Sequence, residues 1–281
     1  EIIRARRKLP GFSGRRLKML FDIGCSEKAI NRVLREKGLL RKYRKKKHKV
    51  KNNLRQVKRK WRLFQQIDAD TKHLYDIPNY YGQMNAMNLP RIQYTAREVT
   101  TGALFVAYAE EVSITYAELF ARRIGQHLKR YGVDLSGTTW QTDNGSEFIG
   151  NWQKKEPPAF TEAIEELKGQ RHVTIPAGEH TYQSDVETVH RTIEDEFYDI
   201  ENFKHIRDFH QRTASYQAWY NLVRTNMNKD YMSPWQIIKK IRPEMSLELV
   251  RLPPLMLDWL GPDYITREEL SLRGYDLPCY P

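Results

Sequence analysis

Cysteine is scarce in this chain of 281 residues, because only Cys25 and Cys279 occur and they lie far apart in the sequence. Two cysteines so far apart argue against a disulfide framework and against a cysteine-based zinc site. Such low cysteine usage is typical of a protein in a reducing compartment. There is no apolar run of roughly 18 residues, so we expect no transmembrane helix and no membrane partner. The first residues also lack the pattern of a signal peptide.

Acidic residues are scarce in the first 62 positions, where 24 lysines and arginines face only four acids and give a net charge of +20. The remaining 23 basic and 31 acidic residues give −8, for the total of +12. Such a front segment favours contact with a polyanion, most simply nucleic acid, over a merely solvated basic arm.

Residues 12–38 predict two short helices, with Ser13 and Ser26 as their N-caps and a turn containing Gly24 between them. Helix, glycine-containing turn and helix form the helix-turn-helix arrangement, so we assign 1–40 to a small all-α DNA-binding domain. The alternative is an ordinary helical hairpin. On the second helix, the candidate DNA contacts are Lys28, Asn31, Arg32 and Arg35.

A basic linker follows at 41–60, with 12 lysines and arginines, no acid and no sustained apolar periodicity. We predict that it follows phosphates along the DNA, which would make binding steeply salt-dependent. The candidate phosphate contacts in this linker are Arg44, Lys45, Lys46 and Lys47.

From Trp61 onward the pattern predicts a mixed α/β domain over 61–243, followed by a C-terminal extension over 244–281. Strands are expected at the start of the domain and in two β-rich runs joined by a turn at Thr100–Gly102, which we predict to pair antiparallel. A helix follows from Ser113, and strands and helices then alternate. The expected segments are strands 61–74, 91–100, 102–111, 138–142 and 171–176, and helices 113–132, 160–169, 184–201 and 203–222.

Three acids take special places in this pattern: Asp70 ends the first strand, Asp143 follows the fourth, and Glu187 lies in the first turns of a helix. If the first and fourth strands are neighbours and that helix packs over their ends, the three carboxylates converge. Oxygen ligands at one point suit Mg²⁺ or Mn²⁺, and two such ions support an in-line phosphoryl displacement. Spacing alone leaves the alternative of separate, solvated acids open.

The local words around these acids, "DTKHL", "QTDNGSEF" and "QSDVETVHRT", resemble the DDE catalytic core of the retroviral integrase and bacterial insertion-sequence transposase superfamily. The resemblance spans roughly residues 61–243, and "TDNGSEF" is its most specific word. A helix-turn-helix and basic linker before the core are similar to insertion-sequence transposases, because a retroviral integrase would bring a His/Cys zinc module. The resemblance implies an RNase H-like, mixed five-stranded sheet flanked by helices.

Carried onto this sequence, the resemblance implies that Asp70, Asp143 and Glu187 are the catalytic, metal-binding triad, with two Mg²⁺ or Mn²⁺ ions. Asp68 competes with Asp70, because it lies two residues earlier on the same strand face, and Asp185 competes weakly with Glu187. The interval of 43 residues between Asp143 and Glu187 is longer than is usual in that family. We place the surplus in a loop insertion around Pro157 and Pro158.

His190 and Arg191 follow Glu187 on the same helix and are candidate contacts to the phosphate near the scissile bond. The alternative is a surface salt-bridge cluster with Glu194. Trp219 and Trp235, like Trp152, are better interpreted as core residues than as platforms for DNA bases.

These patterns together predict a DNA transposase that cleaves 3′ ends and transfers them into target DNA. The expected partners are double-stranded DNA, as terminal inverted repeats and target, and further copies of the chain that bring two ends together. The resemblance implies a prokaryotic cytoplasm, with association to the nucleoid when DNA is bound. A non-catalytic DNA-binding regulator and an RNase H-like nuclease are the alternatives.

Overall fold

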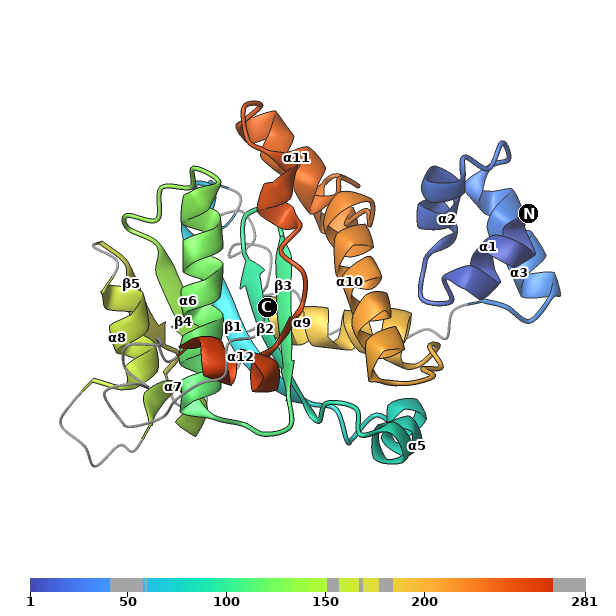
Figure 1. Ribbon diagram of the computed structural model, residues 1–281. Helices are drawn as coiled ribbons and strands as arrows, with labels where there is room; N and C mark the ends of the chain where they lie inside the picture. The colour runs from blue at the N-terminus through green and yellow to red at the C-terminus, as the bar shows by residue number, and fades with distance from the viewer. Residues whose placement is uncertain (41–57, 59, 151–156, 167–168, 177–183, 265–281) are drawn as a thin grey trace, which may run out of the picture.

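The structure is a computed structural model that describes residues 1–40, 58, 60–150, 157–166, 169–176 and 184–264 (Figure 1). The predicted linker contacts Arg44, Lys45, Lys46 and Lys47 lie outside the described residues, as does Trp152. Within the described residues, none of the helices has the length and apolar character needed to cross a membrane.

A mixed sheet of six strands forms the centre of the molecule, in the order β5-β4-β1-β2-β3-β6. β1 pairs antiparallel with β2 and β2 antiparallel with β3, whereas β4 runs parallel to both β1 and β5. This order is that of an RNase H-like sheet and confirms the predicted fold class, with one strand more than expected. The strands are β1 (Gln66–His73), β2 (Ile92–Glu98), β3 (Leu104–Ala109), β4 (Thr139–Thr142), β5 (Arg171–Thr174) and β6 (Leu255–Met256).

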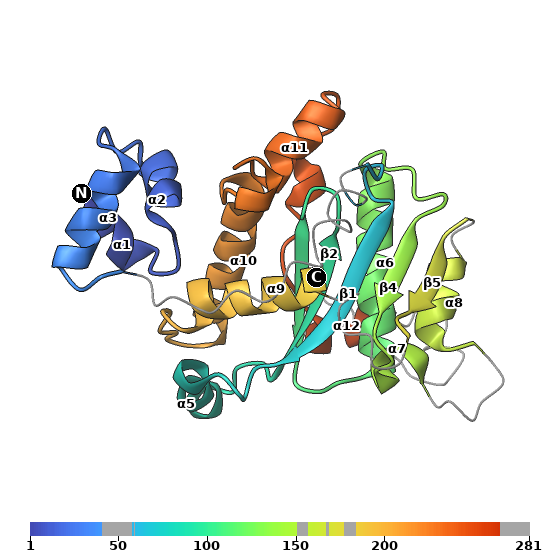
Figure 2. The ribbon, with the colours of Figure 1, turned by 180° about the vertical axis from the view of Figure 1, so that it is seen from behind.

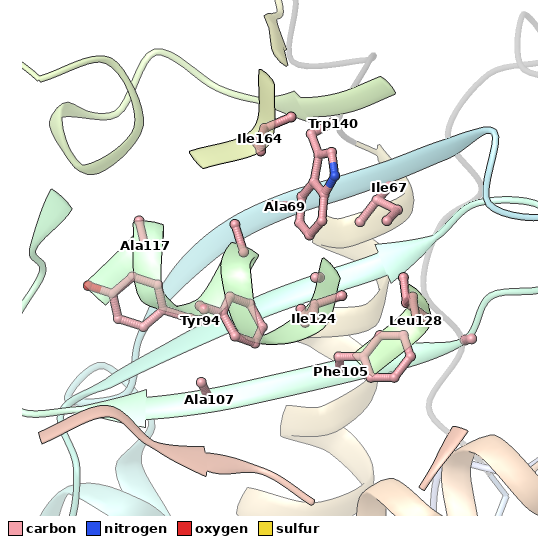
Figure 3. Close-up of a cluster of buried hydrophobic side chains, with 14 of the residues drawn as sticks. Ile67, Ala69, Tyr94, Phe105, Ala107, Ala117, Ile124, Leu128, Trp140 and Ile164 are labelled. Atoms are coloured by element: carbon pink, nitrogen blue, oxygen red, sulfur yellow. The ribbon is translucent and has the colours of Figure 1, made fainter. Parts of the chain in front are cut away.

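Helix α6 (Ile114–Arg130) covers one face of the sheet, and its apolar stripe explains why (Figure 3). Ile124 and Leu128 are fully buried against Ile67 of β1 and Phe105 of β3. Trp140 of β4 closes this core and is 1% exposed. A continuous apolar layer between α6 and the sheet therefore supports β1 and β4 as neighbouring strands.

Two helices cover the opposite face, α9 (Ser184–Ile193) and α10 (Ile206–Leu222) (Figure 2). A second core lies here, in which Val186 and Val189 of α9 pack with Val106 and Tyr108 of β3. Between the two helices, residues Glu194–Tyr198 form a π-helix, η3. The remaining helices are α5 (Pro78–Met87), α7 (Ser146–Ile149), α8 (Ala159–Glu165), η4 (Met227–Lys229), α11 (Pro234–Ile241), η5 (Leu247–Val250) and α12 (Leu257–Tyr264).

The N-terminal residues form three helices, α1 (Ile2–Lys8), α2 (Gly14–Phe21) and α3 (Glu27–Glu36). Ser13 and Ser26 cap α2 and α3 as predicted, by accepting from the backbone N–H groups of Arg16 and Ala29. These helices lie on the α10 side of the sheet, away from β5, in both views (Figures 1 and 2). α1 was not predicted.

Contacts between this helical unit and the core centre on a buried ion pair. Arg224, just after α10, binds Glu196 of η3 with both ends of its guanidinium, at 2.5 and 2.8 Å. Arg16 of α2 lies 3.8 Å from the same carboxylate and donates to the Thr225 carbonyl. Phe12 packs against Trp219, which confirms Trp219 as a packing residue.

Candidate active site

Asp70 lies within β1, on the sheet face that α9 covers. The strand continues to His73 and does not end at Asp70 as predicted, because Thr71, Lys72 and His73 also pair with β2. The Asp70 Oδ1 accepts from the Thr71 backbone N–H at 2.9 Å, and the Asp70 side chain is 16% exposed. Asp68 pairs in parallel register with Gln141 of β4. Continuing that register by two residues places Asp143, the first residue after β4, beside Asp70. The predicted neighbourhood of the first and fourth strands is therefore confirmed.

Asp143 and the turn that follows it form a compact acidic loop before α7. The Asp143 Oδ1 accepts from the Gly145 N–H at 2.9 Å, and Asn144 Nδ2 donates to the Ile175 carbonyl at 3.1 Å. A Cβ atom on Gly145 would lie 2.9 Å from Asp143 Oδ1 and 2.6 Å from Glu147 Oε2. The carboxylates of Asp143 and Glu147 thus both approach the Cα of Gly145, and a larger residue there would have to displace them.

Glu147 is a fourth carboxylate at this place and was not predicted. Its side chain is buried, and its Oε1 accepts from the Thr71 hydroxyl at 2.7 Å. This bond ties α7 to the end of β1, next to Asp70. The signal was present in the sequence, because Glu147 belongs to the same word, "TDNGSEF", as Asp143.

Glu187 extends from the first turns of α9, which contacts both β1 and β2. Its side chain is exposed, whereas its neighbours Val186 and Val189 point into the core. Helical spacing thus fixes which side of α9 carries the acid.

The electrostatics of Asp70 show that these acids share one environment. Burial is the main cause that raises the pKa of Asp70 from 3.8 to about 8. The carboxylates of Asp143, Glu147 and Glu187 contribute to this rise, and the Thr71 N–H bond opposes it. Burial and like charges both disfavour the ionised form. Asp143, Glu147 and Glu187 thus each lie near enough to Asp70 for their charges to affect its pKa.

The chemistry of these four carboxylates suits a divalent cation. Hard cations prefer oxygen ligands, and a bound ion would offset the repulsion among the negative charges. Among the described residues, however, no group of three or more His, Cys, Asp or Glu side chains is placed so that it could hold a metal ion. The acids around Asp70 thus match a divalent cation in charge and ligand chemistry only.

Asp68, the competitor of Asp70, has different neighbours. It is fully buried, accepts from Gln66 Nε2 at 2.6 Å and lies near Lys58, Asp185 and Arg97. Asp185, the competitor of Glu187, forms an ion pair with Lys58. Asp68 and Asp185 therefore share the neighbours Lys58 and Arg97 and form a group separate from the acids around Asp70.

His190 is buried between α9 and the sheet, next to Asp70 of β1 and Thr95 of β2, whereas we expected it at a DNA phosphate. Its Nε2 is 2.9 Å from the Thr95 hydroxyl and its Nδ1 is 3.8 Å from Asp70 Oδ2. Burial, together with the Lys72 charge, lowers the pKa of His190 to about 3, so the ring is neutral at physiological pH. Arg191 is exposed, and Glu194 pairs with Lys72 at 3.5 Å.

On the N-terminal unit, Lys28, Arg32 and Arg35 are exposed along α3. Asn31 is half-buried instead and faces α2, where a Cβ atom on Gly14 would lie 2.4 Å from its Oδ1. Three of the four candidate contacts thus share a solvent-facing surface, and Asn31 packs against Gly14 behind it.

No protein-family model and no curated protein matches the chain. Matching solved structures include two from retroviral integrases. The crystal structure of the catalytic core domain of BIV integrase is 17% identical and covers 63% of this chain and 94% of its own, with a TM-score of 0.41. The cryo-EM structure of the simian T-cell lymphotropic virus intasome in complex with PP2A regulatory subunit B56 gamma is 18% identical and covers 68% and 56%, with a TM-score of 0.42. The fold assignment rests on the strand order and directions and not on these alignments.

Proposed function

We propose that this protein is a DNA transposase that cleaves 3′ transposon ends and joins them to target DNA, with the help of Mg²⁺ or Mn²⁺. The observation that carries the proposal is the parallel register of β1 and β4, which sets Asp143 beside Asp70. The charges of Asp143, Glu147 and Glu187 all help to raise the pKa of Asp70, which reaches about 8. Neighbouring carboxylates of which one has a strongly shifted pKa mark a candidate functional site.

Asp70, Asp143 and Glu187 are the residues that would hold the metal, which when bound would activate an attacking oxygen and stabilise the leaving oxygen of the phosphodiester. The chain's own groups would keep these acids in place. Gly145 lets two carboxylates approach each other, and Thr71 holds Glu147 beside β1. His190 would pack beside Asp70 in its neutral form and so would add no positive charge next to the carboxylate.

The N-terminal unit and the basic linker supply the DNA-binding part of the proposal. Lys28, Arg32 and Arg35 would contact the terminal inverted repeats from the exposed side of α3, and the charge of +20 over residues 1–62 would hold the phosphate backbone. Two ends must be joined in one reaction, so we propose that several copies assemble on DNA.

The test is a strand-transfer assay with a labelled end duplex, Mg²⁺ and the Asp143→Asn variant. We expect loss of joined product with end binding nearly unchanged, because the substitution removes one charge and keeps the side-chain shape. Asp76→Asn is the matched control, since Asp76 is an exposed aspartate of the same region outside the acid cluster. Undiminished joining by Asp143→Asn would contradict the proposal.

Product analysis separates the alternatives. A nuclease would give cleaved ends with no joined product, and a non-catalytic regulator would give neither while still binding DNA. Either pattern from the wild-type protein, with confirmed end binding and Mg²⁺ or Mn²⁺ present, would replace the transposase assignment.

A further inference from the structure

A buried charged group lies between β1 and the start of α9, formed by Lys58, Asp68, Arg97 and Asp185; we call it the Lys58 cluster. Lys58 Nζ forms an ion pair with Asp185 Oδ2, and its side chain is 10% exposed. Arg97 Nη1 donates to the Asp185 backbone carbonyl at 2.9 Å. Two cations from different parts of the chain therefore hold the first turn of α9.

Asp68 is bound into the same cluster from the sheet. It stands directly opposite Arg97 in the β1–β2 register and is fully buried. Its Oδ2 has no hydrogen-bond partner within the part of the chain that the structure describes. Burial raises the pKa of Asp68 to about 7, and the Lys58 charge is the largest influence that lowers it. Lys58 therefore pairs with Asp185 on α9, and Asp68 on β1 lies within reach of its charge.

The two acids of the cluster stand in equivalent positions along the chain. Asp68 precedes Asp70 by two residues on β1, and Asp185 precedes Glu187 by two residues on α9. Two residues that close together on one strand or in one helical turn share the same local backbone. Fixing the position of one therefore restricts the position of the other. Contacts that fix Asp185 relative to the sheet, from Lys58 and from Arg97 of β2, would therefore also bear on the separation between Asp70 and Glu187.

We propose that Lys58 is a positioning residue for the acids around Asp70, in addition to its place in the basic linker; this inference rests on the proposed function. Lys58 draws the first turn of α9 toward β1 and so holds Glu187 at working distance from Asp70. Because Lys58 belongs to the predicted DNA-binding linker, it also joins that segment directly to the catalytic core.

The test compares Lys58→Met with Lys60→Met in the full chain. Methionine keeps the apolar stem of a lysine and removes the charge, and Lys60 is an exposed lysine of the same segment. The first readout needs no catalysis: amide hydrogen exchange in α9, followed on peptides that include Val186 and Val189. We expect exchange about tenfold faster or more in Lys58→Met, and no change in Lys60→Met.

The second readout is strand transfer. We expect Lys58→Met to lower the joining rate by about tenfold or more, with end affinity close to that of Lys60→Met. Misplacing the carboxylates slows the reaction without weakening the binding of DNA to the rest of the protein. Lys58→Arg keeps the charge and should restore both readouts. Unchanged exchange in α9, or a loss confined to DNA affinity, would overturn the positioning role and leave Lys58 as a phosphate contact.

The two readouts also separate this inference from the proposed function. If the wild-type protein joins no DNA, the transposase assignment fails while the exchange experiment still decides whether Lys58 holds α9. If joining is observed and exchange in α9 is unaffected by Lys58→Met, only the inference about Lys58 fails.

Discussion

Replacing Asp70 with asparagine should stabilise the metal-free protein, and more so as the pH rises. The folded-state pKa of Asp70 is raised from 3.8 to about 8, so its ionisation cost is absent below the unfolded value, grows between these two pH values and is complete above about 8. The rise of about 4 pKa units sets a ceiling of roughly 6 kcal/mol, at about 1.4 kcal/mol per unit. Asparagine avoids this cost and can still accept from the Thr71 N–H.

The measurement is urea unfolding of wild type and Asp70→Asn at pH 5 and pH 9, with chelator present. At pH 5 roughly 1.7 kcal/mol of the cost is already present, so the stability gain of the variant should grow by up to about 4 kcal/mol toward pH 9. Asp76→Asn is the control and should stay within about 1 kcal/mol of wild type at both pH values, because its ion pair with Lys72 is exposed. A gain that is constant or falls with pH would refute the reasoning about Asp70.

Three other perturbations test separate parts of the structure. Glu196→Gln leaves the buried Arg224 charge without its counterion and should lower the free energy of unfolding by about 3 kcal/mol or more; a change below about 1 kcal/mol would contradict the buried pair. Trp140→Ala should cost about 3–5 kcal/mol in chemical denaturation, since the side chain is 1% exposed, and a neutral effect would contradict its place in the core. Exchanging Arg32 and Arg35 together for alanine should flatten the log–log salt dependence of end binding by up to about 2, at roughly 0.9 per phosphate contact, and an unchanged slope in a titration would exclude them as contacts.

The layered core could be predicted because its signals are local and repeated. Alternating apolar residues marked the strands, and serine caps marked the starts of α2 and α3. The antiparallel β2–β3 pair followed from the turn at Thr100–Gly102, where Gly102 has a φ of +83°. Ser113 does stand at the N-cap of α6, although its hydroxyl makes no cap bond there.

Elements that depend on distant packing were missed. β6 has two residues and exists because β3 offers a free edge, which a sequence pattern cannot show. The π-helix η3 follows α9 without a sequence break, where Glu196 turns toward Arg224. α5 had a usable signal that was overlooked, because Pro78 stands at its first turn.

The candidate site shows the same division. Asp70, Asp143 and Glu187 could be chosen from local words, and the pKa of Asp70 now links them to one environment. Glu147 lies in the same local word as Asp143, but its bond to Thr71 spans 76 residues of chain and no pattern shows it. Lys58 could not be chosen, because its partner Asp185 lies 127 residues away. Sequence spacing also placed Asn31 and His190 toward solvent, whereas both pack against neighbouring elements.

The two outer strands of the sheet bear on how copies of this protein can associate. β6 has two residues and β5 has four, while the long strands β1, β2 and β3 lie inside the sheet. Short outer strands offer few free backbone groups to a strand from another chain, which guards against edge-to-edge aggregation at high local concentration. If copies gather on DNA as proposed, these two edges of the described sheet give them little backbone to pair through.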